Sequence, residues 1–158
     1  VLLSDPGGPA LEVAREALKA ARVLPAAEVY CVARPEPAAE PGQLLVAALG
    51  PLLEAGGARS KQVALASLQG AGQGQLLVCV EALGRPVSAK AARVSPFARG
   101  ALPVLCLNRA DERVASALIL ARHSPRLAAL FTFRLLATTF GALGESTDWA
   151  VTELSLGR

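Results

Sequence analysis

Residues 101–108 read ALPVLCLN, a nearly unbroken apolar stretch that ends in an asparagine. A strand of this composition is typical of a sheet covered on both faces, because neither of its alternating sets of side chains then has to meet water. A helical pattern follows at once over residues 111–122, where apolar side chains recur every three or four positions. Residues 101–108 therefore indicate an α/β protein, in which helices pack on a sheet.

Strands and helices alternate along the rest of the chain. A link of six residues, 69–74, is too short for the crossover helix that a parallel connection needs, so residues 61–82 are expected to form a hairpin. We expect one α/β domain over residues 1–158, with a mixed sheet of about six strands and helices packed on its faces. The other expected strands are 1–4, 28–34 and 149–156, and the expected helices are 9–23, 43–55 (with a kink or restart at Pro51), a turn around 88–93, 111–122 and 124–140.

The composition is that of a folded chain with a large core. Apolar residues make up 53% of the 158 residues and charged residues only 18%, which excludes a disordered chain and leaves little charge for the surface. We expect some apolar surface to be covered by a partner, by a second copy or by a missing part of the chain. The first residue is Val1 rather than Met, as it would be in an excised domain or a processed product.

Neither a membrane span nor a disulfide framework is expected. The most apolar helix candidate, residues 127–143, carries Arg134 near its centre, where an arginine is costly in a bilayer. Cys31, Cys79 and Cys106 each lie within an apolar run, and their odd number without a CxxC pair argues against disulfides and structural zinc. We expect three buried thiols and a reducing compartment, the cytoplasm or the nucleus.

Positive charge is concentrated in the middle of the chain. Residues 55–110 hold seven basic side chains and one acidic, whereas residues 1–54 hold four basic and seven acidic. A loop that carries Phe97 could meet nucleic acid or an acidic protein surface through four basic residues, Arg85, Lys90, Arg93 and Arg99. We favour a solvated loop whose arginines pair with the acidic first third, because the chain has few aromatic side chains for base stacking.

The first turn of the chain is the strongest sequence candidate for a small-molecule site. Ser4, Asp5, Gly7 and Gly8 lie between a strand and a helix, where free backbone N–H groups attract anions. The segment matches neither GxGxxG nor a P-loop, and Asp5 would repel a phosphate. We favour an ordinary capped turn, and keep a small-molecule or nucleotide-binding enzyme as the alternative function.

Side chains suited to catalysis are scarce. His123, the only histidine, lies between two expected helices, where it would close the end of the first. Asp111 and Glu112 fall in the first turn of a helix, a position that the helix dipole favours. Glu145 and Asp148 could hold a cation or act as acid and base, but they also suit a loop. We expect no cofactor and no metal, and favour a protein that is not an enzyme.

The helix expected at 124–140 is apolar around nearly its whole circumference. Such a helix is either central or covered on its outer side, and a domain of this size has little room for a central helix. We therefore predict a non-catalytic interaction domain or complex subunit, docked to another protein chain or to a second copy and not to a membrane. The predicted interface residues are Leu127, Leu130, Phe131, Phe133 and Phe140.

Overall fold

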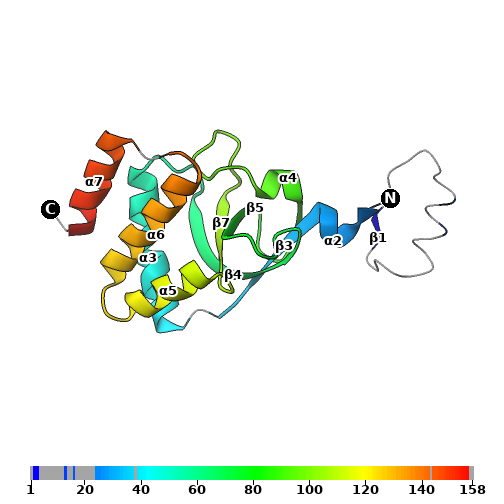
Figure 1. Ribbon diagram of the computed structural model, residues 1–158, viewed down its shortest axis with the longest axis horizontal. Coiled ribbons are helices and arrows are strands. Elements are labelled where there is room, and N and C mark those ends of the chain that lie inside the picture. Colours follow the sequence, from blue (N-terminus) through cyan, green and yellow to red (C-terminus); the bar gives the residue numbers. More distant parts are fainter. Residues whose placement is uncertain are drawn as a thin grey trace.

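Figure 1 shows the computed structural model of the chain, which describes residues 2–3, 13, 16, 24–37, 39–142 and 144–156. The main sheet of this described part has five strands, close to the expected six, in the order β5-β7-β4-β3-β6. β4 and β7 are parallel and the other neighbours antiparallel, which confirms a mixed sheet. The bounds are β3 (Tyr30–Pro35), β4 (Gln62–Gly70), β5 (Leu77–Val80), β6 (Pro86–Ser88) and β7 (Val104–Asn108).

β7, formed by most of the stretch ALPVLCLN, is buried at every position. Leu105 and Leu107 face the larger of two hydrophobic cores, and Val104 and Cys106 face the smaller one on the other side of the sheet. This alternation is the period of two that a strand imposes on its side chains. The apolar run at 101–108 thus has the predicted cause, because both faces of β7 are covered.

The helices are divided unequally between the two faces of the sheet (Figure 1). The larger core lies beneath α3 (Glu40–Ala55), α5 (Glu112–Ala121), α6 (Pro125–Thr139) and α7 (Glu145–Leu156). The opposite face is covered by the short α4 (Ala89–Ala92), through Ala92, and by neighbouring loop residues. The predicted α/β class with helices on both faces is confirmed.

Side-chain caps explain where three of the helices begin. The Asp111 carboxylate accepts a hydrogen bond from the Arg113 backbone N–H at 2.9 Å, and the Ser88 hydroxyl accepts one from that of Ala91 at 3.3 Å. Ser124 caps α6 in the same way, with Pro125 in the first helical position. These caps confirm the starts predicted for residues 111–122 and 124–140 and the turn of helix near 88–93.

The hairpin predicted for residues 61–82 is wrong. β4 and β5 run in opposite directions, but β7 lies between them and pairs with both. Skipping one strand requires a link that bridges about 10 Å, which six residues can span because they reach roughly 20 Å when extended. Asn108 at the end of β7 holds this link, since its side-chain amide donates to the Gln75 carbonyl at 2.8 Å. β7 takes the position between β4 and β5, which the length of the link could not reveal.

The strand predicted at residues 149–156 is also wrong, because this segment belongs to α7. Asp148 and Thr152, one turn apart, contact Arg134 of α6, and Val151 and Ser155, also one turn apart, are buried. Contacts spaced by four residues require a helix. The alternation of apolar and polar residues over 149–156 was too weak to distinguish a strand from a helix.

The N-terminal part forms a separate parallel pair, β1 (Leu2–Leu3) with β2 (Leu24–Pro25), beside α2 (Ala26–Val29). α2 takes the first residues of the strand predicted at 28–34. Of the helix predicted at 9–23, only Val13 and Glu16 fall among the described residues, and both are helical. α3 begins earlier than predicted and continues through Pro51 without a restart. No helix in the described ranges is long and apolar enough to cross a membrane.

Candidate functional site

α6 buries most, but not all, of its apolar side chains. Phe133 is fully buried, and its ring meets that of Phe97 edge-on with centroids 6.3 Å apart, so its prediction as an interface residue is wrong. Leu130 and Phe140 are partly buried against the same core. Leu127 and Phe131 are exposed, at 52% and 45%. Of the five predicted interface residues, these two are the most available to a partner.

α7 presents further large apolar side chains beside them. Trp149 is 70% exposed and Leu156 is 60% exposed. They lie seven residues apart, with Thr152 between them, on one side of the helix. On α6, Leu127 and Phe131 share a side with Arg134 in the same way.

A short network joins these two sides. The Arg134 guanidinium donates to both carboxylate oxygens of Asp148, at 2.9 and 3.0 Å, and to the Thr152 hydroxyl at 3.2 Å. The exposed side of α6 therefore adjoins the exposed side of α7. We call Leu127, Phe131, Trp149 and Leu156 together the outer helical face.

The four basic residues predicted as a patch, Arg85, Lys90, Arg93 and Arg99, are all exposed. None of them forms an ion pair within the described part of the chain, so the expected pairing with the acidic first third is not seen for these four. Arg109 does pair in that way, with Glu36 at 3.1 Å. Phe97 packs on Phe133 in the core and is not placed to stack on a base. The loop thus offers charge without an aromatic platform.

The sequence candidates for catalysis have structural roles. Asp111 caps α5 and also binds the Arg113 side chain at 2.7 Å, and this hydrogen bond lowers the pKa of Asp111. Asp148 is held by Arg134, whereas the side chains of residues 145–147 lie outside the described part. His123 is exposed, and its backbone N–H donates to the Leu120 carbonyl at 3.0 Å, at the end of α5 as predicted.

The three cysteines are free and buried, as predicted. Burial raises the pKa of each thiol, and that of Cys106 reaches about 12 because Cys79 and Cys31 lie nearby as well. A thiol that stays protonated is a poor nucleophile and a poor metal ligand. Among the described residues no group of three His, Cys, Asp or Glu side chains is placed to hold a metal. The turn formed by Ser4, Asp5, Gly7 and Gly8 lies outside the described residues.

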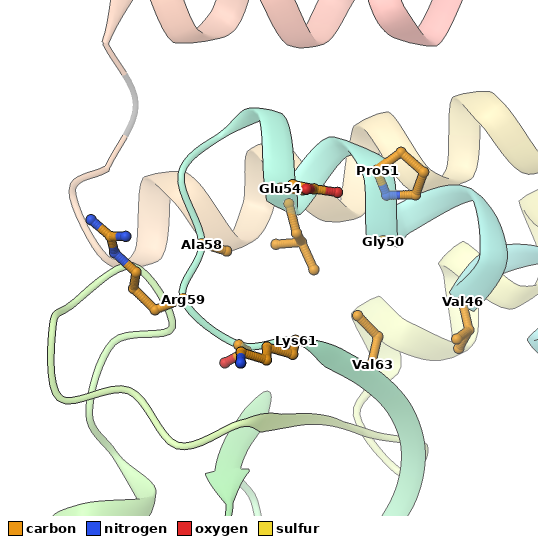
Figure 2. A pocket seen from close by; sticks show the side chains of 10 residues that line it. Val46, Gly50, Pro51, Glu54, Ala58, Arg59, Lys61 and Val63 are labelled. Atoms are coloured by element: carbon orange, nitrogen blue, oxygen red, sulfur yellow. The ribbon is translucent and has the colours of Figure 1, made fainter.

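Figure 2 shows a cavity of about 600 Å³ between the second half of α3 and the start of β4. Nothing in the sequence predicted it, because it joins residues from a helix, a loop and a strand. Two signals were present: a Gly50-Pro51 pair inside an expected helix, and two basic residues that flank Ser60. The cavity is lined by Val46, Gly50, Pro51, Leu53, Glu54, Ala58, Arg59, Ser60, Lys61 and Val63.

Comparisons with protein-family models, with curated proteins and with solved structures find no match for this chain. Its function must therefore be inferred from its own surface and cavities. Within the part of the chain that the structure describes, the outer helical face and the cavity beneath α3 are two features that the helix caps and the packing of the core do not explain.

Proposed function

We propose that this chain is a non-catalytic interaction domain that docks a second protein chain on its outer helical face. The observation that supports this most is the exposure of four large apolar side chains on two adjoining helices. Soluble proteins seldom leave such residues together in water, and contiguous apolar surface of this kind is typical of protein interfaces. Trp149 is the natural centre of the contact, since tryptophan is enriched among residues that dominate binding energy.

The charges around the outer helical face favour a second copy as the occupant. Arg134 and Asp148 already neutralise each other across the two helices. Two further charged residues belong to these helices: Arg126 precedes Leu127 on α6, and Glu153 follows Trp149 by one turn on α7. A twofold pairing of two copies that brings Arg126 of each beside Glu153 of the other would have the self-complementarity that such an interface requires.

The test is the mass of the purified protein in solution. We expect size exclusion with light scattering to show a dimer at tens of micromolar concentration, and Trp149→Ser or Phe131→Ser to shift it towards the monomer. Ile119→Ser is the matched control, because Ile119 is 63% exposed but lies on α5, outside the outer helical face. A wild-type protein that stays monomeric at every concentration contradicts the proposal of a second copy.

A further inference from the structure

Two residues that are unfavourable in a helix lie side by side in α3, at the cavity. In a helix interior glycine is less favourable than alanine, and proline is the least favourable residue of all. Gly50 and Pro51 nevertheless sit inside α3, which is held in place by Leu45, Leu49 and Leu52 on its buried side. Residues that break a local rule are most often found where a protein has a functional site. Both line the cavity of Figure 2.

The cavity has an apolar part and a charged part. In Figure 2, Val46, Val63 and Pro51 lie towards one end, and Arg59 and Lys61 lie towards the other, with the Arg59 side chain extending outwards and Glu54 between the two ends on α3. Leu53 is buried in its wall and continues into the larger core. A ligand with one apolar and one charged end would match this division.

The charged part favours an anion. Within the described residues, Arg59 and Lys61 form no ion pair, and Glu54 is the one acid that lines the cavity with them. The loop that carries the two cations is fixed, because the Arg59 backbone N–H donates to Pro96 at 2.7 Å and that of Lys61 to Pro103 at 2.8 Å. The Ser60 hydroxyl donates to the Leu102 carbonyl at 2.9 Å and anchors the same loop.

From this arrangement we infer that the cavity binds a small organic anion, a carboxylate or phosphate joined to an apolar chain or ring. The anionic group lies at the end of the cavity that Arg59 and Lys61 line, and the apolar group contacts Val46, Leu53 and Val63. A volume of about 600 Å³ falls in the range of small-molecule sites. This inference is independent of the proposed docking, because the cavity shares no residue with the outer helical face.

The direct test is calorimetric titration of the purified chain with octanoate, octyl phosphate, octylammonium and inorganic phosphate. We expect the two amphiphilic anions to bind at least roughly tenfold more tightly than octylammonium, which the two cations repel, and more tightly than phosphate, which lacks the apolar part. Their relative affinities show whether a carboxylate or a phosphate is preferred. Equal affinity for octanoate and octylammonium would overturn the inference.

Charge variants locate the site. We expect the double variant Arg59→Ser/Lys61→Ser to weaken octanoate binding about tenfold, since each exposed charge contributes a factor of roughly two to five. Glu54→Gln removes one negative charge and should strengthen octanoate binding by the factor of roughly two to five expected for a single exposed charge. The matched control is Arg85→Ser/Lys90→Ser, which removes the same charge from residues outside the cavity lining. Equal weakening by both double variants means a diffuse charge effect and overturns the inference.

A cavity-filling variant tests the apolar part. A Cβ at Gly50 would meet no atom within 4 Å, so a side chain can begin there without a clash. We expect Gly50→Leu/Pro51→Ala to keep its helical circular dichroism and to bind octanoate at least tenfold more weakly than Pro51→Ala, the control that lacks the proline but leaves Gly50 in place. Trp149→Ser should bind octanoate as the wild type does. Equal affinity in the filled variant and in Pro51→Ala contradicts the inference, and loss of affinity in Trp149→Ser places the anion on the outer helical face instead.

Discussion

At the scale of single residues, the buried thiols couple stability to pH. Cys106 lies at the centre of β7, and its pKa is raised to about 12 from the ordinary value of 9.0. Between these values the unfolded chain loses the proton and the folded chain keeps it. The unfolded state therefore binds fewer protons, and the free energy of unfolding falls as the pH rises through this window.

We predict a loss of up to about 1.4 kcal/mol per pH unit above pH 9 from Cys106 alone. Below pH 9 this thiol does not make the free energy of unfolding depend on pH, because it is protonated in both the folded and the unfolded state. Urea unfolding of wild type and Cys106→Ala between pH 8 and 11 measures the effect, with the variant losing stability less steeply. Parallel curves for the two proteins would contradict this account of Cys106.

Gly56 packs so closely against the ring of Phe133 that only the hydrogen atom of a glycine fits in place of a side chain. It ends α3 with an ordinary negative φ of −77°, so its backbone does not require glycine. A Cβ there would instead collide with the buried ring of Phe133. We predict that Gly56→Ala lowers the free energy of unfolding by about 1–3 kcal/mol through overpacking.

Gly100→Ala is the control for this substitution, because a Cβ at Gly100 meets no atom within 4 Å. The two variants should differ in urea midpoint at unchanged slope. Equal midpoints would show that Phe133 moves aside freely, contrary to the packing described.

At the scale of elements, α3 is stable despite its own sequence. Pro51 has no N–H to donate to the carbonyl of Ala47, and its ring crowds that carbonyl. We predict that Pro51→Ala raises the free energy of unfolding by about 1–2 kcal/mol, with part of the gain offset by a more flexible unfolded chain. Thermal and urea unfolding measure it. An unchanged or lower stability would mean that Pro51 contributes packing that α3 needs.

The sequence predicted elements well where a local signal determined them. α5 and α6 have side-chain caps at Asp111 and Ser124, and β7 is apolar throughout, so all three were found near their true bounds. α7 was mistaken for a strand because what stabilises it is tertiary: Arg134 lies 14 residues before its partner Asp148. That error also concealed Trp149 and Leu156 as exposed residues on the side adjoining α6.

At the scale of the whole molecule, the α/β class followed from the alternation of patterns, but the order of strands did not. β7 follows β4 and β5 in the sequence but lies between them in the sheet, so no signal within residues 61–82 could exclude a hairpin. The cavity beneath α3 was hidden for the same reason, since Arg59 and Lys61 come to lie opposite Val46 only in the fold. Leu127 and Phe131 were predictable because one helix contains them.

Pairing of two copies through the outer helical face would change the surroundings of a fluorescent side chain that the face itself contains. Trp149 is the one tryptophan in the sequence, and it is 70% exposed in the isolated chain. The most direct measurement is its emission maximum as the protein concentration rises from nanomolar to tens of micromolar. We predict a shift to shorter wavelength as a second copy covers the indole, and no shift in Phe131→Ser. A wild-type maximum that stays at the wavelength of a solvated indole throughout would contradict it.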